Sequence, residues 1–139
     1  MRPCLPLFLI ALGLLAGCGE GSAPLPSKAS AREALQTALD AWKAGKPPSS
    51  LAGAKPGIEV VDFEWKAGKA LSDFSLGEET MGQGTQTIAA TLTLPGEKAP
   101  KPVTYMILGL DPLRIFRDED FHRALNMDNA PVEPPKGRR

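Results

Sequence analysis

An apolar run near the N-terminus, residues 5–15, constrains this chain more than any other feature. It follows a single basic residue, Arg2, and its eleven residues would form a helix about 16 Å long. The hydrocarbon core of a bilayer is about 30 Å thick, so the run is too short for a permanent transmembrane helix. A short apolar run between a positive charge and small residues is typical of a cleaved export signal. The folded part must then come from the residues that follow, which suffice for one domain.

The residues that close the apolar run are Leu15, Ala16, Gly17 and Cys18. Their order resembles the lipobox of bacterial lipoproteins, in which a signal peptidase recognises the first three residues and cleaves before the cysteine. The resemblance implies that Cys18 carries a thioether-linked diacylglycerol and an acyl chain such as palmitate, which together hold a protein to a membrane almost permanently. Gly19 stands where an inner-membrane retention signal would place Asp. The resemblance therefore implies export to the cell envelope, with the periplasmic face of an outer membrane favoured where the cell has one.

Composition divides the rest of the chain. The residues after Cys18 are small, polar and rich in proline, and the last ten contain three prolines and no hydrophobe larger than valine. Cys4 falls within the predicted signal, so the mature domain has no disulfide and depends on its hydrophobic core for stability. The predicted parts are a signal peptide (1–17), a lipidated cysteine with a disordered tether (18–29), a domain (30–128) and a disordered tail (129–139).

The first predicted element of the domain is an amphipathic helix. Ser30 is expected to be its N-cap, with Glu33 completing a capping box. Gly45 is expected to end it, since two prolines follow. Four apolar residues at helical spacing predict the buried face: Leu35, Ala38, Leu39 and Trp42. Trp42 is the expected anchor of the core.

After the helix, alternation with a period of two predicts β-strands. The first two strands are expected to pair as a hairpin, a loop should occupy residues 77–84, and the next two strands should form a second hairpin. A short helix from Asp118 is left open. The predicted strands are residues 58–66, 70–76, 85–94, 103–110 and 113–117.

These elements predict an α+β fold, with one N-terminal amphipathic helix packed on a four- to five-stranded antiparallel meander sheet. Their order resembles the cystatin-like and NTF2-like folds, and the whole chain resembles the small lipoproteins that bacteria encode in numbers. Folds of this kind carry enzymes, inhibitors and transport factors alike, so the resemblance does not imply one activity.

Few residues suggest catalysis or metal binding. His122 is the single histidine, and no serine stands in a nucleophile motif that would pair with it. The acidic residues 118–120 lack the glycine and glutamate spacing of an EF-hand, and are expected to cap a helix and pair with arginines. Asp62 and Glu64 are expected on one exposed strand face. The sequence therefore predicts no catalytic residue, no metal and no cofactor.

Charge and glycine patterns exclude further classes. The chain has 16 basic and 16 acidic residues, so it has no excess charge to attract nucleic acid. Gly82 and Gly84 form only G-x-G, without the strand and helix of a phosphate loop.

Three hypotheses follow. The first is a non-catalytic membrane-anchored module that binds an envelope protein or another envelope component through its sheet face or its long loop; the residues that would make this contact are left open. The alternative is an NTF2-like pocket protein or enzyme, in which Tyr105 or Asp62 points into a small-ligand cavity. The third is a purely structural role in the envelope.

Overall fold

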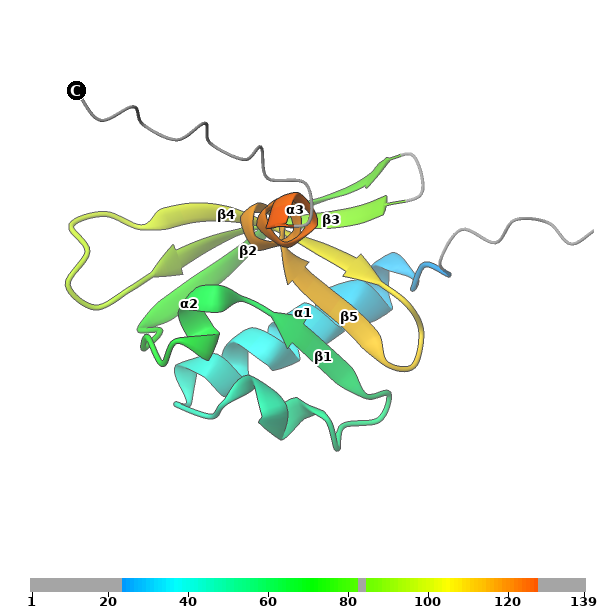
Figure 1. Cartoon of the computed structure of the whole chain (residues 1–139), viewed down its shortest axis with the longest axis horizontal. Coiled ribbons are helices and arrows are strands. Elements are labelled where there is room, and N and C mark those ends of the chain that lie inside the picture. Colours follow the sequence, from blue (N-terminus) through cyan, green and yellow to red (C-terminus); the bar gives the residue numbers. More distant parts are fainter. Residues whose placement is uncertain (1–23, 83–84, 128–139) are drawn as a thin grey trace, which may run out of the picture.

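The computed structural model describes residues 24–82 and 85–127, and within them it confirms an α+β fold built on a five-stranded sheet (Figure 1). None of the described helices is long and apolar enough to cross a membrane. The elements, in chain order, are α1 (Lys28–Lys43), the 3-10 helix η1 (Pro48–Leu51), β1 (Ile58–Val61), α2 (Phe63–Lys66), β2 (Asp73–Gly82), β3 (Thr85–Thr93), β4 (Lys101–Leu108), β5 (Leu113–Arg117) and α3 (Asp118–Met127).

The sheet is mixed rather than antiparallel throughout, which corrects the predicted meander. Its strand order is β1-β5-β4-β3-β2, and β1 pairs with β5 in parallel while the other neighbours are antiparallel. The predicted strands over residues 85–94 and 113–117 are confirmed, and β4 lies at the centre of the sheet, as its apolar residues predicted. The first strand therefore forms one edge of the sheet and β2 forms the other.

The predicted hairpin between residues 58–66 and 70–76 is wrong. Strand β1 ends at Val61, because the side chain of Asp62 accepts hydrogen bonds from the backbone N–H groups of Glu64 and Trp65 and caps the short helix α2. Capping by an aspartate gives the backbone an alternative to the extended strand. The chain then turns away from β1 and crosses to the far edge of the sheet.

Strand β2 is longer than predicted, and it occupies most of the expected loop at 77–84. It pairs with β3 from Asp73 to Gly82, with an irregularity in the register between Leu76 and Glu79. A Cβ at Gly77, within this irregularity, would lie 3.3 Å from the Cβ of Ala89 on β3. The glycine thus allows the two strands to approach closely where the register shifts, and pairing continues beyond it.

Helix α1 packs on one face of the sheet and supplies much of the core. Leu35, Leu39 and Trp42 are buried, as the predicted apolar face requires. Alternate residues of the strands, such as Ile88 and Ile115, are fully buried in the same core. The helix begins three residues earlier than predicted, with Ser27 rather than Ser30 as its N-cap.

Helix α3, which the sequence left open, lies on the opposite face of the sheet (Figure 1). Phe116 alternates with the buried Ile115 on β5 and meets Phe121 of α3 edge to face, with ring centroids 5.4 Å apart. On β3, the outward residues Thr91 and Thr93 are exposed. Helix α3 therefore covers the outer face around Phe116 and its register partner Met106, whereas the outer face at β2 and β3 is open.

The turn between β4 and β5 depends on Gly109. Its φ is +81°, and a Cβ would lie 2.7 Å from the backbone oxygen of Pro112. We expect Gly109→Ala to lower the free energy of unfolding by about 2–3 kcal/mol, because it adds a steric clash to the strain of a left-handed backbone. Gly96→Ala is the matched control, since Gly96 also has a positive φ but nothing within 4 Å of its Cβ position. Urea unfolding would contradict this account if the two variants lost equal stability.

Candidate functional site

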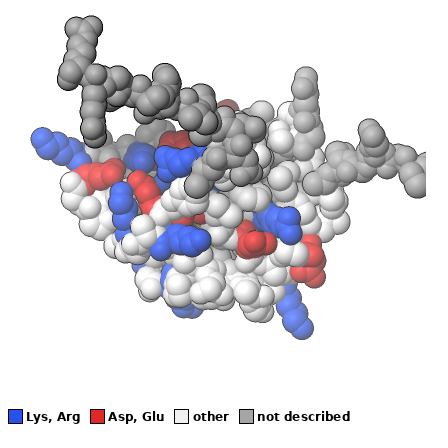
Figure 2. Space-filling model, viewed as in Figure 1, with Lys and Arg blue, Asp and Glu red and all other residues white. Residues whose placement is uncertain are grey.

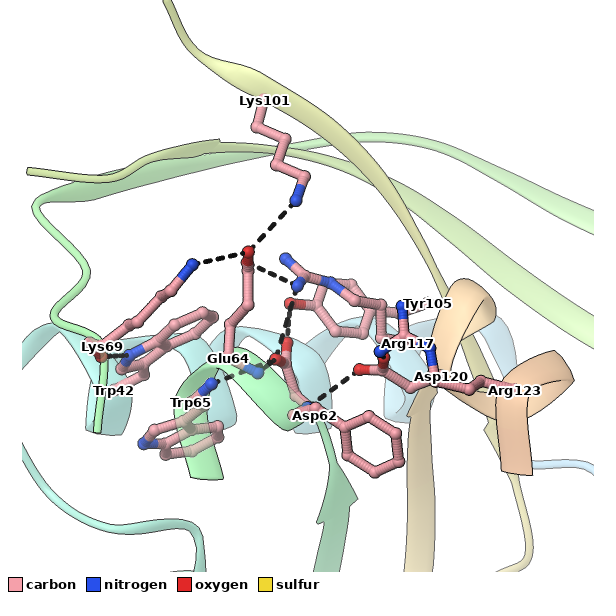
Figure 3. Close-up of polar contacts among 11 residues, drawn as sticks. Trp42, Asp62, Glu64, Trp65, Lys69, Lys101, Tyr105, Arg117, Asp120 and Arg123 are labelled. Atoms are coloured by element: carbon pink, nitrogen blue, oxygen red, sulfur yellow. Dashed lines mark hydrogen bonds and ion pairs between the residues drawn. The ribbon is translucent and has the colours of Figure 1, made fainter. Parts of the chain in front are cut away.

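The structure concentrates buried charge where α2 meets β4, β5 and α3 (Figure 3). Among the described residues, the buried charged side chains are Asp62, Arg117 and Asp120. Asp62 follows β1, Arg117 ends β5 and Asp120 lies in the first turn of α3. Because a buried charge is costly unless it is paired, this group is the chemically distinctive part of the domain. We call these three residues, with Glu64 and Tyr105, the polar cluster.

Asp62 is at the centre of the polar cluster. Its Oδ1 caps α2 by accepting the N–H groups of Glu64 and Trp65 at 3.1 and 3.2 Å. Its Oδ2 accepts the hydroxyl of Tyr105 at 2.8 Å, and Nη1 of Arg117 lies 3.6 Å from Oδ1. Tyr105 and Arg117 are register partners on adjacent strands, so the pairing of β4 with β5 brings both to the same carboxylate.

Glu64 closes the polar cluster toward the solvent. Its Oε2 accepts Nη1 of Arg117 at 2.6 Å, and its Oε1 accepts the ammonium groups of Lys69 and Lys101, both at 3.2 Å. The two lysines come from the segment after α2 and from the start of β4. One carboxylate thus joins three cations from three different segments, and its side chain is 18% exposed.

Asp120 and the two tryptophans complete the attachment of α2. Oδ2 of Asp120 accepts the backbone N–H of Phe63 at 2.9 Å, which ties α3 to the start of α2. Trp65 stacks on Trp42 of α1, with ring centroids 5.5 Å apart and planes 8° apart. The indole N–H of Trp42 donates to the carbonyl of Lys69 at 2.6 Å. Helix α2 is therefore held by the sheet, by α1 and by α3.

The surroundings change the acidity of these groups. Burial raises the pKa of Asp62 above its ordinary 3.8. The positive charge of Arg117 and the hydrogen bonds that Asp62 accepts act to lower this pKa, but burial prevails. Burial also acts to raise the pKa of Glu64, but the hydrogen bonds from its three cations prevail and lower it to about 2. The pKa of Tyr105 is raised by burial and by the negative charge of Asp62. At neutral pH Tyr105 is therefore a donor and Glu64 a carboxylate.

The central groups of the polar cluster are buried, and they are not all paired. Asp62 and Tyr105 are each 1% exposed and bind each other, so neither side chain is presented to a solute. Within the described residues, Nε and Nη2 of Arg117 and the side-chain amide of Gln86 have no hydrogen-bond partner. Arg117 nevertheless carries both ion pairs of the cluster, and its pKa is raised because Asp62 and Glu64 outweigh the effect of burial. The ion pairs and hydrogen bonds of the cluster thus hold α2 against β4, β5 and α3.

Acidification tests the contribution of Glu64. A folded-state pKa of about 2, below the ordinary 4.5, means that Glu64 adds stability above pH 4.5 that is lost as the pH falls toward 2. We expect Glu64→Gln to lower the free energy of unfolding by about 2 kcal/mol at pH 7 and by much less at pH 2. The raised pKa of Asp62 acts in the opposite direction in both proteins, so the difference between them isolates Glu64.

The measurement is urea unfolding at several pH values between 7 and 2. The matched control is Glu59→Gln, because Glu59 is 60% exposed and pairs with Arg114 at the surface. A difference between wild type and Glu64→Gln that does not change with pH would contradict the proposed role of the ion pairs.

The other residues considered in the sequence analysis do not come together in one site among the described residues. His122 lies on α3 with 65% of its side chain exposed, 3.4 Å from the carboxylate of Asp118. Within the described parts of the chain, no three His, Cys, Asp or Glu side chains gather as metal ligands. Gly82 ends β2. The lipobox residues Leu15, Ala16, Gly17 and Cys18, as well as Gly84 and the C-terminal tail, lie outside the described residues.

Sequence reasoning missed the polar cluster. Asp62 and Glu64 were expected to be exposed on one strand, whereas Asp62 is buried as a helix cap and Glu64 binds three cations. One available signal was the position of Asp62 directly before the apolar Phe63, because an aspartate that precedes an apolar residue also suits an N-cap. Another was Arg117, which is at the same side of its strand as the apolar Leu113 and Ile115.

Comparison with known proteins adds no identification. The chain matches none of the protein-family models with which it was compared, and no curated protein either.

Proposed function

We propose that this protein is a membrane-anchored bacterial lipoprotein whose non-catalytic α+β domain binds another protein or a component of the cell envelope. The lipobox-like residues Leu15–Cys18 support the anchor. The open outer face of β2 and β3 supports the binding role, and it is the observation on which that role depends. On this face Thr91 and Thr93 of β3 are exposed, and β2 is a free edge of the sheet.

The distribution of charge also suits binding to a protein rather than to nucleic acid. On the face drawn in Figure 2, basic and acidic side chains intermingle among uncharged ones, and no broad area of one sign is present. Nucleic-acid binding depends on a concentrated basic surface. A partner would therefore be recognised by the shape and hydrogen bonding of the sheet face.

The alternative, an NTF2-like pocket protein or enzyme, requires Tyr105 or Asp62 to face a ligand. Both are buried and hydrogen-bonded to each other, and Trp42 and Trp65 stack within the core beside them. These contacts favour the binding module. A purely structural role in the envelope would be supported by a cell-shape defect after gene deletion together with the absence of any specific adduct in the cross-linking experiment below.

Mass spectrometry of the native protein tests the anchor. We expect a mature chain that begins at Cys18 and carries a diacylglycerol and an acyl chain, and that fractionates with membranes. Cys18→Ser should remove the lipid and prevent processing, because the sulfur is the attachment point. An intact leader, or a mature chain that starts elsewhere without fatty acid, would refute the lipoprotein assignment.

Site-specific cross-linking in cells tests the binding face. A photoreactive residue at Thr91, on the open sheet face, should give a defined adduct whose partner is identified by mass spectrometry. The same residue at Gln36, on the exposed side of α1, is the control. Adducts from Gln36 alone, or equal and unspecific adducts from both positions, would refute the sheet face as the binding surface.

A further inference from the structure

The first described residue is attached to one end of the sheet. The backbone N–H of Gly109, in the turn between β4 and β5, donates to the carbonyl of Pro24 at 2.8 Å. The chain between Cys18 and the folded domain therefore ends at this turn. We call this part of the molecule the entry end; it comprises Pro24, the turn at residues 109–112 and the last residues of β2.

Two exposed hydrophobic side chains, Leu110 and Met81, lie at the entry end. Within residues 24–82 and 85–127, the large hydrophobic side chains that are exposed are Met81, Leu110 and Leu125. Leu110 is in the turn itself and is 55% exposed, and Met81 is 50% exposed. Met81 belongs to the same end, because it pairs with Gln86, which in turn pairs with Ile107 next to the turn.

An apolar hollow of about 510 Å³ opens beside Leu110. Phe121 of α3 lines it together with Phe116 of β5. Exposed apolar side chains around a concave surface are typical of an interaction site. Most of the residues that line it are apolar (Pro24, Leu108, Leu110, Pro112, Phe116 and Phe121), and two charged residues, Asp111 and Arg114, also line it.

The length of the chain outside the described residues limits what can meet this surface. Six Cα–Cα steps separate Cys18 from Pro24, and they span at most about 22 Å when fully extended. An eight-residue strand such as β4 is itself about 26 Å long. A lipid on Cys18 therefore keeps the entry end close to the membrane, while the opposite end of the sheet, where Ala99 lies, can be farther away.

We infer that the entry end is a membrane-contacting surface, in which Leu110 and Met81 enter the interfacial region of the bilayer that holds Cys18. This inference rests on the proposed lipid anchor and adds an orientation to it. The apolar face of an interfacial helix is buried about 5–10 Å into the boundary between headgroups and acyl chains, and apolar side chains exposed at the end of a sheet can enter the same region. Without Arg2, which falls within the predicted signal, the chain has 15 basic and 16 acidic residues. It has no excess positive charge, so apolar contact rather than electrostatic attraction supplies the docking. The β3–β4 turn would then point away from the membrane.

Fluorescence quenching on vesicles tests this orientation. The full lipidated protein, in vesicles of phosphatidylethanolamine and phosphatidylglycerol, would carry one introduced cysteine with an environment-sensitive dye: Leu110→Cys, Met81→Cys or, as control, Ala99→Cys. All three positions are exposed, and Cys18 is blocked by lipid, so the introduced thiol is the reactive one. We expect iodide to quench the dye at 110 and at 81 about fivefold less than at 99.

The outcomes separate the two proposals. If the protein floats with vesicles but all three dyes are quenched equally, the orientation is refuted and the anchor stands. If the protein carries no lipid and does not float, both are refuted. Shielding of positions 110 and 81 in cells but not in vesicles would assign the entry end to a protein partner and overturn contact with lipid.

Discussion

Trp42→Ala will lower the free energy of unfolding by about 3–5 kcal/mol, because it removes one of the two tryptophan side chains of the core. Trp42 is 2% exposed, stacks on Trp65 and donates its indole N–H to the carbonyl of Lys69. The substitution leaves a cavity and a carbonyl without its donor. Small domains are stable by about 5–15 kcal/mol, so the expected loss is a large fraction of the total. Urea unfolding followed by far-UV circular dichroism measures it.

Trp42→Phe is the matched control for this prediction. Phenylalanine keeps an aromatic ring that can stack on Trp65 but has no N–H for the carbonyl of Lys69. We expect a smaller loss of about 1–2 kcal/mol, which reports the hydrogen bond and the residual change in packing. Equal losses in the two variants would indicate that the hydrogen bond outweighs packing, and a loss below 1 kcal/mol in Trp42→Ala would contradict the core described here.

Arg117→Met will also lower the free energy of unfolding by about 3–5 kcal/mol, although methionine fits an apolar environment. Arg117 is 2% exposed and is the cation 3.6 Å from Asp62 and 2.6 Å from Glu64. Removing one partner of a buried ion pair leaves the other charge uncompensated. Helix α2 should loosen first, since Asp62 caps it and Glu64 belongs to it. Hydrogen exchange of the N–H groups of Glu64 and Trp65 would report this loosening.

Arg114→Met is the control on the same strand. Arg114 lies on the other face of β5, is 58% exposed and pairs with Glu59 at 3.4 Å. Surface ion pairs contribute little, so we expect a change within about 0.5 kcal/mol. If both substitutions destabilised the domain equally, burial would not explain the role of Arg117.

Local periodicity was sufficient to predict several elements. The apolar spacing of Leu35, Ala38, Leu39 and Trp42 predicted α1 and its buried face. Gly45, with a φ of +77°, follows the end of this helix as expected. The alternation in residues 85–94 predicted β3 because each β3 side chain faces either the core or the solvent. These features depend on residues close together in the chain.

Pairing and burial over long distances were not predictable in the same way. The alternation in residues 58–66 suits a strand, yet Asp62 caps a helix whose position depends on Tyr105 and Arg117. Those two residues reach Asp62 because β1 lies beside β5, and no local pattern distinguishes that arrangement from a hairpin. The polar cluster could therefore be recognised only from the folded structure. The lipid-bearing Cys18 remains a prediction from the sequence, because it lies outside the described residues.

The parallel pairing of β1 with β5 affects the order in which the molecule can mature. These two strands are separated in the chain by the three others, so the register from Ile58 to Val61 has no partner until Leu113–Arg117 exists. Contacts between distant segments form late and slow the folding of a chain. During synthesis from the N-terminus, α1 and β1 are made early, but β1 has no strand to pair with. The sheet can be completed only when β5, nearly the last folded segment, has been synthesised.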